Sequence, residues 1–96
     1  MDSISLEEAL HALNTSIVEI ETLIFEKDKF SREVLIRHGE LDNYRNSLKF
    51  RYNFTNEAIG FIEDLQRRYK SNDLQILYNR FSDCLRQLGK YIKSLE

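Results

Sequence analysis

Two long stretches of the chain place apolar residues at alternating steps of four and three. The first stretch comprises Leu6, Leu10, Leu13, Ile17, Ile20 and Ile24, and the second comprises Leu74, Tyr78, Phe81, Leu85, Leu88, Ile92 and Leu95. This spacing is that of the seam along which α-helices pack in coiled coils and bundles. The 96 residues also include no proline, which helix interiors exclude. We therefore expect an all-α protein with few turns.

Capping residues set the expected ends of the first helix. Ser5 and Glu8 are spaced as a capping box, in which each side chain bonds the other residue's backbone amide. We expect the first helix to cover about residues 5–37. The apolar seam falters before residue 34, so a kink near 28–31 with Ser31 as a new cap is an open alternative.

Gly39 is the best stop signal in the chain, because glycine readily takes the left-handed conformation that ends helices. An uninterrupted helix through this position is also open, since an internal glycine costs only about 1 kcal/mol relative to alanine. We expect a second helix over about 41–70 and a third over about 73–95. Residues 1–96 then form a single helical domain, a three-helix antiparallel bundle or a helical hairpin with coiled-coil character.

The expected second helix has an unusually wide apolar arc between residues 48 and 65. A helix that is apolar on two sides needs neighbours on two sides. The arc predicts either the central helix of the bundle or a helix that also meets another chain. We expect a partner-binding surface around Phe50, Phe54 and Phe61, with Tyr44 and Arg51 at its rim, although all five could instead be internal.

No pattern in the sequence points to catalysis, a metal or a cofactor. Glu8 and His11 match one Glu-x-x-His step of di-iron helical bundles, but the second step and the further glutamates are missing. Cys84 is the only cysteine, and its place in an apolar stripe favours a buried, unreactive thiol. We predict a protein that is not an enzyme.

Arg32 and His38 are separated by five residues, a spacing that resembles the Arg/His motif of HEPN ribonucleases, which are helical bundles. The resemblance covers these two residues only, and Glu33 stands where those families usually carry a small polar residue. It implies that Arg32 and His38 would cleave RNA at a dimer cleft.

Charge is unevenly distributed along the chain, whose net charge is −2. The first 36 residues hold eight acids and three bases, whereas the remaining 60 hold eight acids and eleven bases. This favours an acidic helix packed beside more basic ones. The bases are interleaved with acids, which argues against nucleic acid as a partner even though Arg45, Lys49 and Arg51 alternate with aromatic residues.

The chain begins without a basic region followed by an apolar run and has no apolar stretch long enough to span a membrane. We therefore expect a cytoplasmic protein that does not insert into membranes. The most direct functional interpretation is a non-enzymatic protein-interaction module that binds amphipathic helices, such as a small adaptor, complex subunit or chaperone, alone or as an oligomer. The alternative is a small regulatory factor, such as an antitoxin or immunity-like protein or a nucleic-acid-binding protein.

Overall fold

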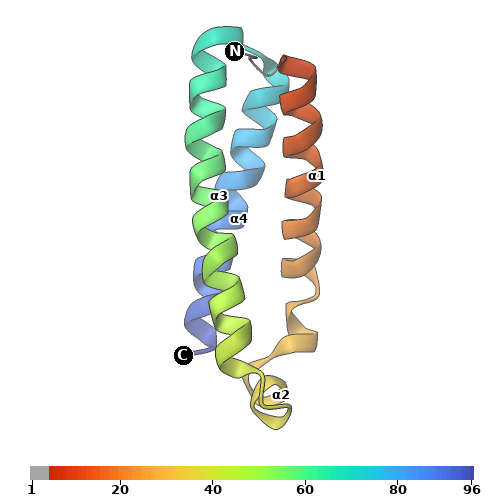
Figure 1. The fold of residues 1–96 in the computed structure, drawn as a ribbon, viewed down its shortest axis with the longest axis vertical. Coiled ribbons are helices and arrows are strands. Elements are labelled where there is room, and N and C mark those ends of the chain that lie inside the picture. The colour runs from red at the N-terminus through yellow and green to blue at the C-terminus, as the bar shows by residue number, and fades with distance from the viewer. Residues whose placement is uncertain (1–4) are drawn as a thin grey trace.

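The computed structural model describes residues 5–96, and every regular element among them is helical. The elements are α1 (Leu6–Phe25), the 3-10 helix η1 (Lys27–Phe30), α2 (Arg32–Arg37), α3 (Leu41–Tyr69) and α4 (Asn72–Ser94). Three long helices lie side by side along a molecule 47 Å in length, with the short η1 and α2 at one end (Figure 1). The all-α bundle expected from the sequence is confirmed.

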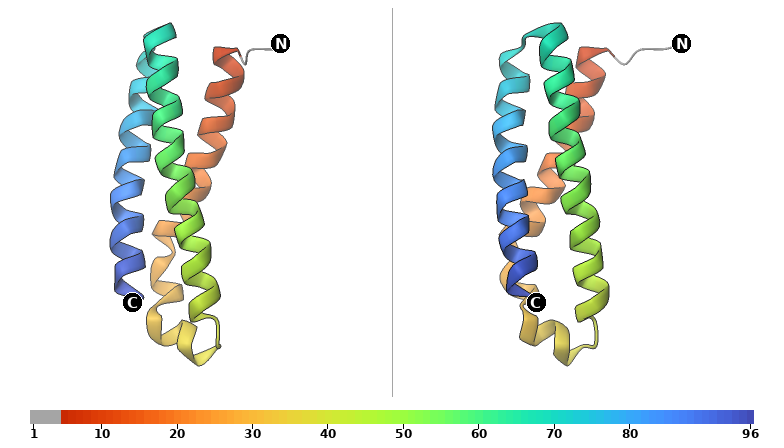
Figure 2. Two further views of the ribbon diagram at one scale, coloured as in Figure 1. Left: turned by 60° about the vertical axis from the view of Figure 1, so that its left-hand side comes forward. Right: turned by 90° about the vertical axis from the view of Figure 1, so that its left-hand side faces the viewer.

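The three long helices alternate in direction, so that α3 runs antiparallel to α1 and α4 (Figure 1). Helix α4 packs along both α1 and α3, whereas α1 and α3 make little direct contact. Both views of Figure 2 show α1 crossing the α3–α4 pair at an angle. The central helix is thus α4, and the expectation that the helix over 41–70 occupies the centre is wrong. The wide apolar arc of that helix is only partly covered.

The core follows from the two seams. On α1 the buried seam residues are Leu13, Ile17, Ile20 and Ile24. On α4 the deepest line is shifted from the expected one, because α4 has neighbours on two sides and buries residues that flank the expected seam. This line consists of Leu74, Leu77, Phe81, Cys84, Leu88, Tyr91 and Leu95.

The first helix begins as expected but ends early. Ser5 and Glu8 form the capping box, and α1 then stops at Phe25. The continuous helix over 5–37 is therefore wrong, and the alternative with Ser31 as a new cap matches the structure, since the Ser31 hydroxyl accepts a hydrogen bond from the Val34 amide.

Gly39 ends α2 with a φ of +71°, in the left-handed region. The Gly39 amide donates to the Ile36 carbonyl and the Glu40 amide donates to the Leu35 carbonyl. These two bonds form the Schellman motif and satisfy carbonyls that the end of the helix would otherwise leave unpaired. The chain then reverses into α3, so the open question at Gly39 is resolved as a helix end.

None of the helices within residues 5–96 combines the length and apolar character needed to cross a membrane.

Candidate functional site

Two hollows lie between α1 and α3 and together form an open groove, because these two helices make little direct contact while both pack on α4. Its upper part is a hollow of about 290 Å³. Small residues and two phenylalanines line it together. The lining consists of Ala12, Leu13, Ser16, Phe54, Glu57, Ala58 and Phe61.

The structure places the three predicted phenylalanines on one exposed stripe of α3. Phe54 and Phe61 are 43% and 40% exposed and both line the upper hollow. Phe50 is 76% exposed and lies one turn below Phe54, beside the groove and outside its lining. The alternative that these side chains belong to the internal core is wrong for the described chain.

The two predicted rim residues lie farther along the same groove. Tyr44 and Arg51 line a second hollow between α3 and α1, together with Glu19 and Glu26 from α1. The buried Nε of Arg51 has no hydrogen-bond partner among residues 5–96. An unpaired buried donor is costly.

Tyr44 also packs against other aromatic rings at the lower end of the groove. Its ring stacks on Phe30 with centroids 5.3 Å apart and meets the edge of Tyr91 at 6.1 Å. This aromatic cluster closes the lower end of the groove where η1 crosses beneath it. Tyr44 is therefore only a partial contributor to any free surface.

Sequence reasoning missed the opposite wall of the groove, which α1 provides through Ala12, Ser16 and Glu19. Small side chains off the main seam of α1 were the available signal. They matter only once α1 is known to diverge from α3, and that information is absent from the pattern of a single helix.

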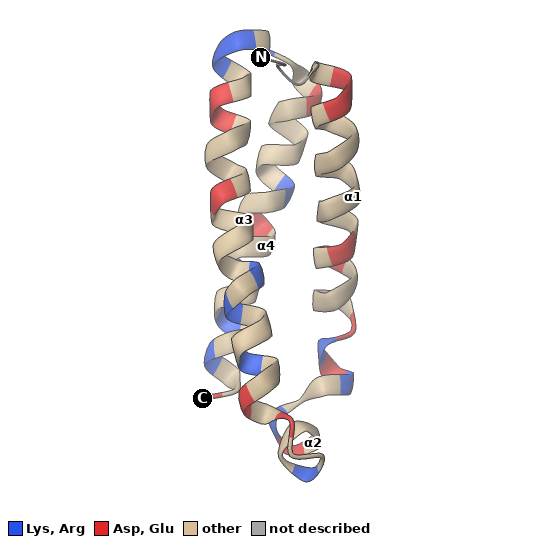
Figure 3. Ribbon diagram, viewed as in Figure 1, with Lys and Arg blue, Asp and Glu red and all other residues tan. Residues whose placement is uncertain are grey.

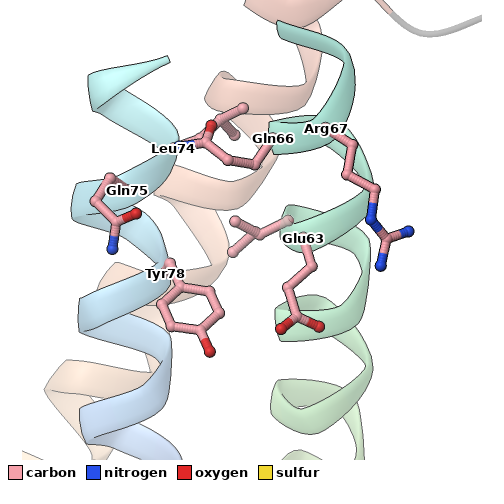
Figure 4. A pocket seen from close by; sticks show the side chains of 7 residues that line it. Glu63, Gln66, Arg67, Leu74, Gln75 and Tyr78 are labelled. Atoms are coloured by element: carbon pink, nitrogen blue, oxygen red, sulfur yellow. The ribbon is translucent and has the colours of Figure 1, made fainter. Parts of the chain in front are cut away.

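A third hollow lies between α3 and α4 near the turn that joins them (Figure 4). Figure 4 shows that the side chains of Glu63 and Arg67 extend from α3 and that Tyr78 extends from α4 on the facing side. Arg67 is already paired with Asp64 on the surface at 2.8 Å. This hollow lacks a stripe of exposed aromatic residues and offers no nucleophile beside a base.

The chemistry-bearing side chains are scattered. No group of three or more histidine, cysteine or acidic residues that could hold a metal comes together within residues 5–96. Cys84 is buried, and burial raises the pKa of its thiol to about 11. Arg32 and His38, the pair that resembles the ribonuclease motif, are exposed at opposite ends of α2.

Other exposed apolar side chains stand apart from the groove. Phe25 ends α1, Ile36 lies on α2, and Ile76 is 55% exposed on α4. None of the three lines the hollows between α1 and α3. Single exposed apolar residues are common on protein surfaces, so the groove remains the strongest candidate site.

No protein family, curated protein or solved structure matches the chain.

Proposed function

We propose that this protein is a non-enzymatic protein-interaction module, an adaptor, complex subunit or chaperone-like protein, that binds a partner helix in the groove between α1 and α3. A partner helix laid there would complete a four-helix arrangement with α1, α3 and α4. Helix-in-groove recognition reuses the packing of apolar stripes that builds the bundle itself.

The observation that supports the proposal is the exposure of Phe54 and Phe61 at the mouth of an apolar hollow. Burying the exposed part of each ring would contribute roughly 1 kcal/mol, taking about 1.5–3 kcal/mol for a whole side chain. Ala12, Ser16 and Ala58 leave room between the rings for a side chain of the partner. Aromatic anchors are typical of the centre of protein interfaces.

The test compares groove variants with a control on another helix. Phe54→Asp and Phe61→Asp should each abolish capture of the partner from the native host, because each places a charge where apolar contact is made. Ile76→Asp makes the same change at a similarly exposed residue of α4 that lies outside the groove, and it should leave capture intact. Circular dichroism and solution mass verify that all three variants fold.

If both groove variants keep their partner while remaining folded, the proposed binding surface is wrong. If Ile76→Asp loses capture to the same extent, the proposed binding surface is also wrong, because an added charge anywhere on the surface would then be sufficient to prevent capture.

A further inference from the structure

We infer that the occupant of the groove is a single amphipathic helix of about five turns whose apolar stripe is flanked on both sides by lysine or arginine. This inference rests on the proposed function and adds the chemical class of the partner.

The length of the occupant follows from the span of the groove. Its lining on α3 extends from Tyr44 to Phe61, which at 1.5 Å per residue is about 25 Å. A helix of about 17 residues covers this distance. Phe54 and Phe61 are seven residues apart, so their rings stand two turns apart and flank a partner side chain inserted between them.

The charge of the occupant follows from the two rims. Glu19 stands on the α1 wall and Glu57 on the α3 wall, and neither carboxylate takes part in an ion pair within residues 5–96. Glu26, lower on the α1 wall, is 3.2 Å from Lys29 and is therefore partly neutralised. Arg51 is the only cation in the lining of the two hollows.

Acids on both walls attract a helix whose two flanks are both basic. A helix with acidic flanks would bring like charges together beside Glu19 and Glu57, and like charges across an interface are repelled. Rim charges of this kind set specificity more than affinity, while the apolar stripe supplies the burial.

A second copy of this chain is a poorer fit on the same grounds. Its exposed apolar stripe is the one on α3, and charges of both signs lie next to that stripe, with Lys49 and Arg51 beside Phe50 and with Glu57 and Asp64 nearer to Phe61. Self-docking would therefore place Glu57 and Asp64 of one copy against the acidic rims of the other, a repulsion that a helix with two basic flanks does not meet.

The experiment uses two designed peptides of about 18 residues that share one leucine stripe at steps of three and four. One carries lysine at the flanking positions and the other carries glutamate. Binding of each labelled peptide to the full chain is measured by fluorescence anisotropy at about 0.05 M and about 0.3 M salt. The lysine peptide should bind about tenfold more tightly at low salt, as expected for a few exposed ion pairs, and the difference should shrink at high salt.

Variants of the chain identify which acidic residues cause the preference for the lysine peptide. Glu19→Lys combined with Glu57→Lys should reverse the preference between the peptides. Glu63→Lys is the matched control, because Glu63 is an exposed acid of α3 in the separate hollow shared with α4 (Figure 4), and it should leave the preference nearly unchanged. An equal effect of Glu63→Lys would overturn the inference, since it would indicate attraction to overall charge only.

The remaining outcomes separate the inference from the proposed function. If both peptides bind equally and both lose binding in Phe54→Asp, the groove binds helices but the assignment of basic flanks is wrong. If neither peptide binds, the inference is wrong, and capture from the host decides the proposed function on its own. If the chain self-associates and Phe54→Asp makes it monomeric, the occupant is a second copy and the inference is overturned.

Discussion

At the scale of single residues, Cys84 shows how burial determines chemistry. Its thiol is enclosed between α4 and α1, and its pKa rises to about 11 because desolvation disfavours the thiolate, with smaller contributions from Glu21 and Asp83 that Arg80 opposes. The unfolded thiol has a lower pKa of about 9. The unfolded state therefore releases its proton first, and this group reduces stability as pH rises from about 9 to 11.

We predict that Cys84 reacts with iodoacetamide far more slowly in the folded chain than in concentrated urea. At pH 8, a thiol pKa of about 11 in place of about 9 lowers the thiolate fraction about a hundredfold. Burial also protects the thiol sterically. Timed alkylation followed by mass spectrometry measures both rates. Similar rates in the two states would contradict the buried position of the thiol.

At the scale of elements, the break between α1 and α2 depends on a side chain from the other end of the sequence. The Tyr91 hydroxyl of α4 lies 2.8 Å from the Phe30 carbonyl and 3.3 Å from the Lys27 carbonyl. Both carbonyls belong to η1, where the α-helical bonding pattern has stopped. The hydroxyl thus donates its one proton to the nearer Phe30 carbonyl, a backbone group that the break leaves unpaired. Burial and the hydrogen bond with Tyr44 raise the pKa of Tyr91.

We predict that Tyr91→Phe lowers the free energy of unfolding by about 1–3 kcal/mol, the usual cost of leaving a buried acceptor unsatisfied. Tyr52→Phe on α3 is the control, because the half-buried Tyr52 has no side-chain hydrogen bond among residues 5–96, and it should change stability by less than about 0.5 kcal/mol. Urea denaturation measures both variants. An equal loss in the two would show that the hydroxyl contact is unimportant.

At the scale of the whole molecule, an ion pair links two of the long helices, and the charged residues are unevenly distributed along the long axis. Arg80 of α4 makes two hydrogen bonds, of 2.6 Å and 3.0 Å, to the carboxylate of Glu21 on α1. This contact agrees with the expectation that the acidic first helix packs beside a more basic one. Figure 3 shows basic residues at the upper end of α3 and along the lower parts of α3 and α4.

We predict that the chain gives no mobility shift with mixed RNA and DNA at about 0.1 M salt. Four of the eleven bases in residues 37–96 are paired with acids, among them Arg45 with Asp42 and Arg86 with Asp83. The others are interleaved with acids along the chain, which weakens the release of counterions from phosphates. A shift that weakens steeply with added salt would contradict this and would favour the alternative of a nucleic-acid-binding factor.

Much of the fold was predictable because its signals are local. The capping box at Ser5 and the left-handed turn at Gly39 depend on residues within one or two turns of each other. The start of α3 agrees with the expected residue, and the ends of α3 and α4 differ from expectation by one residue each. The break after Phe25 was less predictable, because Tyr91 stabilises it from 61 residues beyond Phe30.

The candidate site was predictable only on one wall. The excess of apolar residues on α3 pointed to Phe50, Phe54 and Phe61, since no single neighbour could cover so wide an arc. Whether that excess was covered depended on where α1 lies. The structure places α1 mainly against α4, which leaves Phe54 and Phe61 exposed. Ala12 and Ser16 of α1 then form the opposite wall of the groove.

The sequence by itself determined that the chain is helical, where most helices begin and end, and which face of α1 is buried, because periodicity and caps act over a few residues. Only the tertiary structure decided that α4 is central and that a groove lies open between α1 and α3. Which helices become neighbours depends on how the apolar stripes of all three helices pack into one core. The pattern of a single helix does not contain that information.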